Sequence, residues 1–167
     1  MNTDSAGQPE VLHVKGGYVV PNPCFGLADA VKKIHASDEP RQMKVEEVPS
    51  MQAWLKSQAE KAVEHERAAQ RNWTEAEAAE KQMKELDKSL AKLHKAPPSF
   101  HVNGQVDAGL KLKKKIAADI EHAERRAKHN ERMAEQTRRI TKEWRDANPW
   151  WPKLLADYND IYGTRLL

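Results

Sequence analysis

The chain has 167 residues, of which 39% are hydrophobic and 32% are charged. Typical globular domains contain about 45–50% apolar and about 25% charged residues, so this composition argues against a compact globule with a thick core and favours long, solvent-exposed helices or partial disorder. The single cysteine excludes an internal disulfide and a cysteine-based zinc site, the formal net charge of +3 is too small to require an anionic partner, and no apolar run approaches the roughly 20 residues of a membrane span.

The first part of the chain, residues 1–49, is predicted to be a small mixed region. Residues 1–10 are polar, lack the basic and apolar regions of a signal peptide, and are expected to form a flexible tail, so a cytoplasmic protein is the default expectation. In residues 11–49, two β-prone runs flank Gly16-Gly17 and predict a β-hairpin. A short amphipathic helix at 25–35 and a linker with an extended stretch at Met43–Val48 are expected to follow.

A long helix is predicted from Ser50, a favourable N-cap residue, to Ala96, because this segment contains neither proline nor glycine. A seven-residue repeat runs through it and defines one seam, with a second seam three residues later. The two seams are Leu55, Ala62, Ala69, Ala76, Met83 and Leu90, and Gln58, His65, Asn72, Ala79, Leu86 and Leu93. The small and polar residues in the first half of these seams predict that this half buries less apolar area.

A second long helix is predicted over Leu110–Ala147, ended by Asn148-Pro149. Its narrow stripe follows alternating steps of four and three: Ile116, Ile120, Ala123, Ala127, Asn130, Ala134, Thr137, Thr141 and Trp144. Residues 50–147 are therefore predicted to fold back as a long antiparallel helical hairpin resembling a coiled coil, with its turn at 97–109 and a small β-hairpin at Asn103-Gly104. A fold about residue 102 brings Leu86 near Ala118 and Leu90 near Lys114. At the open end of the hairpin it brings Trp54 near Trp144, Trp150 and Trp151.

Two alternatives to this isolated hairpin stay open. A continuous bent helix in a parallel oligomer is disfavoured by Pro97-Pro98 and Gly109. A third helix from another copy is the other alternative, since it would complete the polar seam positions, so a homo-oligomer remains open.

Residues 148–167 are predicted to form an aromatic-rich C-terminal helix with Gly163 as its C-terminal cap. Tryptophan and tyrosine are common at interface hot spots, so five residues are candidates for protein docking: Trp144, Trp150, Trp151, Tyr158 and Tyr162. The alternative interpretation places them in the core of the base, packed on Trp54 and on the N-terminal region.

A basic cluster surrounds the predicted turn and is the second candidate contact site. Its members are Lys88, Lys92 and Lys95 before the turn and Lys111, Lys113, Lys114 and Lys115 after it. The lysines before the turn complement a helix C-terminus, whereas those after it oppose the dipole of a helix N-terminus and lack that structural explanation. Phosphates of a nucleic acid, an acidic protein surface and simple solubility are the three interpretations.

No pattern in the sequence predicts a catalytic, cofactor-binding or metal-binding residue. The histidines lack zinc-site spacing, Cys24 has no nearby histidine or aspartate in sequence, and no glycine-rich phosphate loop is present. The carboxylates alternate with lysine and arginine, which is typical of a solvated helix face.

These features predict a non-enzymatic structural or assembly protein, a helical-hairpin spacer or brace that docks on a larger complex such as a virion or bacteriophage particle. The expected partner is a larger protein assembly, without membrane contact. The alternative is a nucleic-acid-binding or nucleoprotein-associated module that uses the basic end. A small protein inhibitor or adaptor is a third hypothesis.

Overall fold

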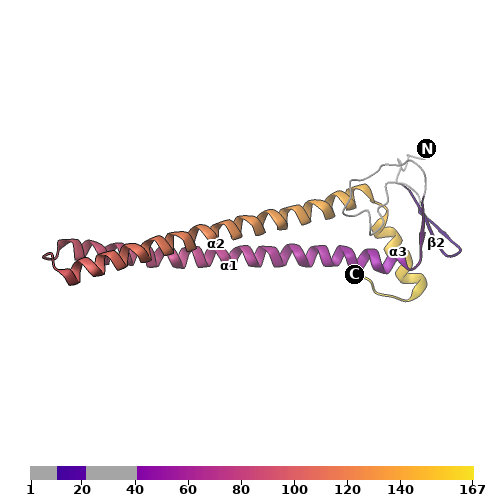
Figure 1. The fold of residues 1–167 in the computed structure, drawn as a ribbon. Helices are drawn as coiled ribbons and strands as arrows, with labels where there is room; N and C mark the ends of the chain where they lie inside the picture. Colours follow the sequence, from indigo (N-terminus) through magenta and orange to yellow (C-terminus); the bar gives the residue numbers. More distant parts are fainter. Residues whose placement is uncertain (1–10, 22–40) are drawn as a thin grey trace, which may run out of the picture. The chain divides into compact units, whose positions relative to one another are not determined.

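The computed structural model describes residues 11–21 and 41–167, and this part of the chain is mainly helical (Figure 1). Its elements are β1 (Leu12–Val14), β2 (Gly17–Val20), β3 (Arg41–Lys44), α1 (Glu47–Lys95), α2 (Phe100–Ala147) and α3 (Trp151–Tyr162). The two long helices α1 and α2 pack antiparallel against each other, which confirms the predicted helical hairpin. The expected helix at 25–35 and the tail at 1–10 lie outside the described residues.

The strands form an antiparallel sheet in the order β1-β2-β3. The predicted hairpin is present, but its turn is Lys15-Gly16 rather than Gly16-Gly17. Gly16 has φ of 90°, a backbone conformation that side chains disfavour. Gly17 belongs to β2, opposite Lys44, and a Cβ atom there would lie 2.0 Å from the carbonyl oxygen of Met43. Gly16 therefore provides the positive φ that the turn needs, and Gly17 leaves room for the close approach of β3.

Helix α1 begins at Glu47, three residues before the predicted start, so Ser50 is not its N-cap. The Glu47 carboxylate accepts a hydrogen bond from the Lys44 backbone N–H at 2.7 Å, and the Ser50 hydroxyl donates to the Glu46 carbonyl at 3.2 Å. Pro49 lies in the first turn, where a missing N–H has no cost. The extended segment is correspondingly earlier than predicted, at Arg41–Lys44.

The turn between the long helices is much shorter than the predicted span of 97–109, because α2 already begins at Phe100. Pro97-Pro98 interrupts the helix, and the Ser99 hydroxyl accepts the Val102 N–H at 3.2 Å as an N-terminal cap. The small β-hairpin predicted at Asn103-Gly104 is wrong, since both residues are helical. Within the described residues, positive φ occurs at Gly16 and Gly163 and not at the glycines of α2.

The earlier start of α2 shifts the pairing of the two helices. Gly109, predicted to lie in the turn, faces Leu90: a Cβ atom at position 109 would lie 2.6 Å from Leu90 Cδ2. Leu90 therefore packs near Gly109 rather than near Lys114. Leu86 shares a groove with Ile116 instead of approaching Ala118.

The predicted seams are confirmed by burial. The buried residues of the long helices include Leu55, Ala62, Ala69, Ala76 and Leu90 in α1, and Ile116, Ala123, Ala127, Ala134, Thr137 and Trp144 in α2. The second α1 seam is half-buried throughout, as expected from its polar and small members. Six of the seven seam alanines are at most 4% exposed, so two helices are enough to cover these six, whereas Ala79 is half-buried.

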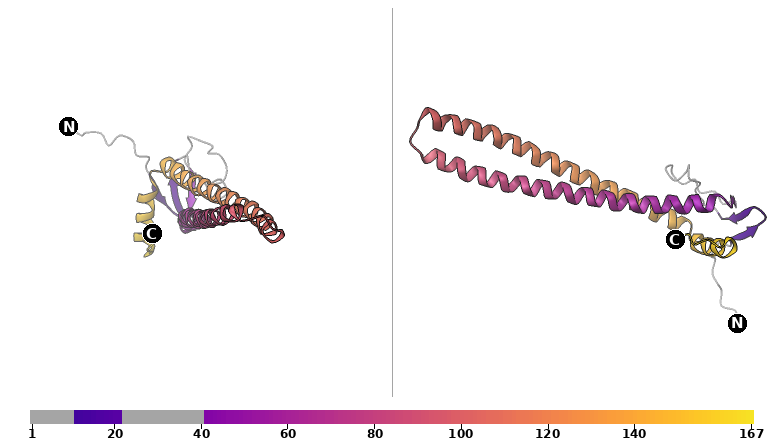
Figure 2. Two further views of the ribbon diagram at one scale, coloured as in Figure 1. Left: turned by 90° about the vertical axis from the view of Figure 1, so that its left-hand side faces the viewer. Right: turned by 90° about the horizontal axis from the view of Figure 1, so that it is seen from below.

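The chain divides into two compact units, each containing part of α1 and part of α2. Unit 2 is Val63–Glu135, the segment that contains the turn, and its two helical parts lie side by side in Figures 1 and 2. Unit 1 is formed by Met1–Ala62 and Gln136–Leu167.

Unit 1 has a core in which the sheet, the start of α1, the end of α2 and α3 meet. Its buried members are Tyr18, Val20, Met43, Val48, Met51, Leu55, Trp144, Trp150, Trp151, Leu154 and Tyr158. The α3 helix ends as predicted at Gly163, whose φ is 63°. The Asn159 side chain then holds the last residues, accepting the Leu166 N–H at 3.0 Å and the Thr164 hydroxyl at 2.7 Å.

Candidate functional site

The basic end of unit 2 is the strongest candidate site. We define it as residues 81–115, the last part of α1, the turn and the first part of α2. It contains nine lysines and three acidic residues, a formal charge of +6, although the whole chain carries +3. The remaining residues therefore sum to −3, and the excess positive charge of the protein is confined to this segment.

Two of the seven predicted lysines have ion-pair partners. Lys113, half-buried at the helix interface, lies 2.6 Å from an Asp87 carboxylate oxygen, and Lys88 lies 2.7 Å from Glu85. The other five are exposed and form no ion pair with any residue that the structure describes: Lys92, Lys95, Lys111, Lys114 and Lys115. Uncompensated ammonium groups of this kind are free to neutralise an external anion.

The structure brings these lysines to one end of the hairpin but not onto one surface. In α1, Lys88 and Lys95 lie opposite the seam formed by Leu86 and Leu90, because side chains repeat every 3.6 residues. In α2, Lys111, Lys114 and Lys115 likewise lie on the side that faces away from α1. The predicted cluster around the turn is therefore divided between two outward faces, because the helices pack through their seams.

The structure adds two lysines to the α1 group. Lys81 and Lys84 are exposed and continue the series at helical spacing, one to two turns before Lys88. The resulting set, which we name the α1 lysine stripe, is Lys81, Lys84, Lys88, Lys92 and Lys95. A count of lysines at steps of three and four residues along the helix finds this set, whereas the predicted cluster contained only the lysines of the last turns.

The aromatic candidates for docking form the core of unit 1. Trp144 is 2% exposed and stacks edge-on against Trp151 with ring centroids 5.4 Å apart. Trp54 lies 6.4 Å from Trp144, as predicted from the fold-back. Trp150 and Tyr158 are also buried. Trp144, Trp150, Trp151 and Tyr158 are at most 6% exposed and offer little surface to a partner. Tyr162, at 42% exposed, is the accessible member of the docking set.

Tyr18, a buried member of this core, has a raised pKa. It is fully buried, and its hydroxyl has no hydrogen-bond partner among the described residues. Burial raises the pKa of the Tyr18 hydroxyl above its ordinary value, and the negative charges that Tyr162, Asp157 and Tyr158 can carry raise it further. The neutral phenol is thus the form that the core accepts.

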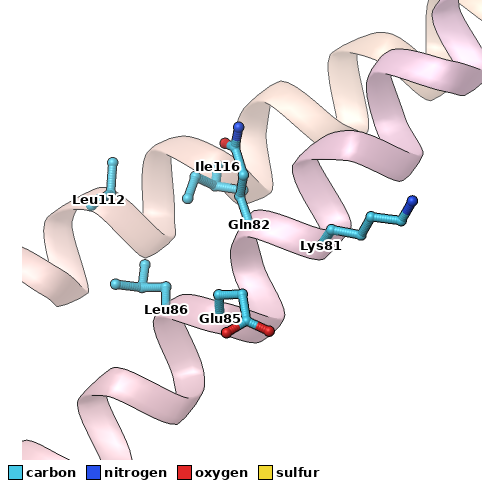
Figure 3. Close-up of a pocket in the computed structure, with 6 residues that line it drawn as sticks. All are labelled: Lys81, Gln82, Glu85, Leu86, Leu112 and Ile116. Atoms are coloured by element: carbon cyan, nitrogen blue, oxygen red, sulfur yellow. The ribbon is translucent and has the colours of Figure 1, made fainter.

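An apolar groove lies on one flank of the helical hairpin in unit 2. Leu86, Leu112 and Ile116 form its floor and Lys81, Gln82 and Glu85 its rim, and its volume is about 460 Å³ (Figure 3). Leu112 is 47% exposed. The groove is open and lined by both helices, and it lies beside the α1 lysine stripe, with which it shares Lys81.

Polar side chains connect the helices elsewhere in unit 2. His65 Nδ1 and Asn130 Oδ1 lie 3.2 Å apart between the seam alanines, and the Asn130 amide donates to the Arg126 carbonyl at 3.0 Å. Trp73 Nε1 donates to Glu131 at 2.7 Å, with the Lys128 ammonium 5.9 Å from the Trp73 ring centroid. These contacts join α1 and α2 along unit 2.

Residues with metal or nucleophile chemistry do not assemble into a site in the described part of the chain. Over residues 11–21 and 41–167 there is no group of three or more His, Cys, Asp or Glu side chains placed to hold a metal ion. Cys24 lies outside the described residues. Among the described helices, none combines the length and the apolar composition needed to cross a bilayer.

Comparison with protein-family models, with curated protein sequences and with solved structures finds no match for this chain.

Proposed function

We propose that this protein is a non-enzymatic structural or assembly protein, in which the helical hairpin is a spacer or brace within a larger complex. The observation that carries the proposal is the seam. Six of its seven alanines are at most 4% exposed with two helices alone, so at these positions α1 and α2 cover each other without a further partner. Such a hairpin keeps its outer faces free and extends without a thick core, which suits a brace better than a substrate-binding domain.

The attachment surface in this proposal is the exposed part of α3. Ile161 is 50% exposed and Tyr162 is 42% exposed, and the Tyr162 ring lies 4.7 Å from that of buried Tyr158. An aromatic residue anchored on a packed core loses little conformational freedom when it binds. This assignment replaces docking through Trp150 and Trp151, whose substitution would disrupt the core. A cytoplasmic complex or a virion or bacteriophage particle is the proposed location.

Sedimentation in an extract of the natural source tests the proposal. At physiological salt, the wild-type chain should sediment with a particle much heavier than its own 19.0 kDa. The double variant Ile161→Ser, Tyr162→Ser should sediment more slowly, because it lacks the apolar contact. Circular dichroism should show unchanged helicity, since both side chains are substantially exposed.

A matched control is Leu110→Ser, Leu112→Ser, which changes two comparably exposed apolar residues in unit 2 (44% and 47%). It should leave sedimentation unchanged. Sedimentation of the wild-type chain as a free monomer or small oligomer would contradict the structural role, and equal release by both double variants would contradict attachment through α3.

The second candidate function is a nucleic-acid-binding or nucleoprotein-associated module. The charge of +6 on residues 81–115, with five lysines that have no ion pair among the described residues, favours it. Treating the same extract with nuclease before sedimentation separates the two functions. A protein-mediated complex should survive this treatment, whereas a complex held through nucleic acid should dissociate.

A further inference from the structure

We propose that the α1 lysine stripe binds the phosphate backbone of duplex nucleic acid without reading its sequence. The inference deepens the second candidate function, on which it rests, by naming the face and the partner.

The stripe is a continuous surface on the outer side of α1. Its five lysines follow one another at steps of three or four residues, opposite the buried seam. Over the fourteen residue steps from Lys81 to Lys95 the helix rises about 21 Å, close to the length of six base pairs at 3.4 Å each. Glu85, which pairs with Lys88 at 2.7 Å, is the acidic residue within this face.

The lysines of α2 form a smaller set. Lys111, Lys114 and Lys115 lie within little more than one turn on the outer face of α2. On the same face, Asp107 precedes them and Glu121 follows them. Two acidic residues therefore bracket the α2 set, while the α1 stripe extends over about four turns. A linear array of phosphates is better matched by the longer stripe.

The composition of the stripe favours nucleic acid over an acidic protein. Protein interfaces are depleted in lysine and enriched in aromatic residues, methionine and arginine at their centres. The stripe contains lysine, with alanine and glutamate as its other outward residues, and no aromatic anchor. A lysine ammonium on a flexible stem binds phosphate as a point charge and makes no bidentate contact with a base edge.

The same composition favours a duplex over a single strand. Sequence-tolerant binding of single strands depends on stacking of bases on aromatic side chains. The outward positions between Lys81 and Lys95 contain no aromatic residue, and the nearby Phe100, although 98% exposed, lies beyond the turn. Charge neutralisation along a straight helix requires no unstacked base, so a duplex suffices.

Fluorescence anisotropy with labelled 20-base-pair duplexes tests the proposal. Two duplexes of unrelated sequence should bind the wild-type chain equally, and affinity should fall by on the order of several hundred-fold between 50 and 200 mM salt if five phosphates are neutralised. The variant Lys84→Gln, Lys88→Gln, Lys92→Gln should reduce the slope of log K against log salt by about 2.7. These residues are exposed, and glutamine is a good helix former, so folding should be unaffected.

The matched control is Lys111→Gln, Lys114→Gln, Lys115→Gln, which removes the same charge from α2. It should keep the affinity within about two-fold of the wild type. A loss as large as that of the α1 variant would show that binding follows net charge rather than this face, and would overturn the proposal while leaving the basic end as a site.

Two further outcomes overturn it. No binding of the wild-type chain at 50 mM salt would contradict both duplex binding by the stripe and the second candidate function. Tighter binding to labelled polyglutamate than to duplex, lost in the α1 variant, would assign the stripe to an acidic protein instead. The assembly role is tested separately, because it would be contradicted by sedimentation of the chain as a free monomer and not by these binding measurements.

Discussion

At the scale of single residues, the buried phenol of Tyr18 shows how a core selects a protonation state. Its hydroxyl is fully buried and has no hydrogen-bond partner among the described residues. Because burial and then the charges of Tyr162, Asp157 and Tyr158 raise its pKa, ionisation costs more in the folded than in the unfolded chain. Folding is therefore favoured below the unfolded pKa of about 10, and this contribution is lost as the pH rises through the higher folded value.

Tyr18→Phe should separate this effect from packing. At pH 8 the variant should be as stable as the wild type or more stable by about 1 kcal/mol, because a buried donor without a partner is removed and the ring is kept. Above pH 10 the wild type should lose stability faster than the variant. Urea unfolding at pH 8 and pH 11 measures both. An equal loss of stability in the two proteins between pH 8 and pH 11 would show that the pKa of Tyr18 is the same in the folded and unfolded chains.

Residue-scale features were the hardest to predict from sequence. Gly16-Gly17 indicated the hairpin correctly, but the pattern could not tell which glycine forms the turn and which lies beneath Met43 of a strand some 25 residues later. Gly104 and Gly109 predicted a turn by their local chemistry. The structure gives both helical backbone, because packing of α2 on α1 outweighs a propensity cost of about 1 kcal/mol per glycine.

At the scale of elements, those two glycines of α2 differ in their surroundings. A Cβ atom at Gly104 would meet nothing within 4 Å, whereas one at Gly109 would lie 2.6 Å from Leu90 Cδ2. The first glycine weakens the helix without a packing role. The second permits close approach of α1 and α2 beside a buried leucine.

Substitutions at Gly104 and Gly109 should change the stability of the protein in opposite directions. Gly104→Ala should stabilise the protein by about 0.5–1 kcal/mol, since alanine is the better helix former. Gly109→Val should destabilise it by about 1–3 kcal/mol, because its branched side chain overpacks the interface at Leu90. Thermal unfolding followed by circular dichroism at 222 nm compares them. Stabilisation by Gly109→Val would disprove the close contact.

The elements themselves were largely predictable, because a long periodic pattern outweighs local uncertainty. The seven-residue repeat through Leu55, Ala62 and Ala69 located the buried side of α1, and the four-and-three steps through Ala123 and Ala127 located that of α2. The pairing between them was displaced because it depends on the turn. With residues 97–109 taken as turn, the predicted fold-back centred several residues too late.

The polar seam positions have a role that the repeat alone could not give. His65 and Asn130 were each predicted to lie in a seam, and the structure pairs them at 3.2 Å. A seam of identical alanines specifies its register weakly, and a hydrogen-bonded polar pair favours one alignment over its neighbours.

At the scale of the whole molecule, the two units bury side chains of different size. Unit 1 has a core that includes Trp144, Trp150, Trp151 and Leu154, whereas the middle of unit 2 is closed by alanines such as Ala76 and Ala127. Apolar burial stabilises by about 25 cal/mol per Å², so the alanine seam contributes less per residue. Regions with little apolar burial open at lower free energy than the global unfolding.

Two probes should therefore report different unfolding transitions in urea. In the variant Trp73→Phe the remaining four tryptophans all belong to unit 1 and report its core. Far-UV circular dichroism is dominated by α1 and α2. The dichroism midpoint should precede the fluorescence midpoint. Coincident transitions would show that the chain unfolds as one cooperative unit in spite of its uneven core.

The candidate site was half predictable at this scale. Composition near residues 88–95 and 111–115 located the basic end, since charge can be counted along a chain. The charge count could not show that the lysines lie on two outward faces, because this depends on the sides through which the helices pack. For the aromatic residues the sequence left two interpretations open, a docking surface and a core, and the structure places four of the five candidates in the core.

The uneven charge of unit 2 gives it a permanent electric dipole moment. Residues 81–115 carry +6, while 63–80 and 116–135 together hold six basic and ten acidic residues, or −4. The macrodipoles of α1 and α2 oppose each other and largely cancel, so side-chain charges set this moment. In the field of a polyanion the unit experiences a torque that turns the end containing residues 96–99 forward before any contact forms. At about 0.1 M salt this alignment is confined to the last ~10 Å of approach.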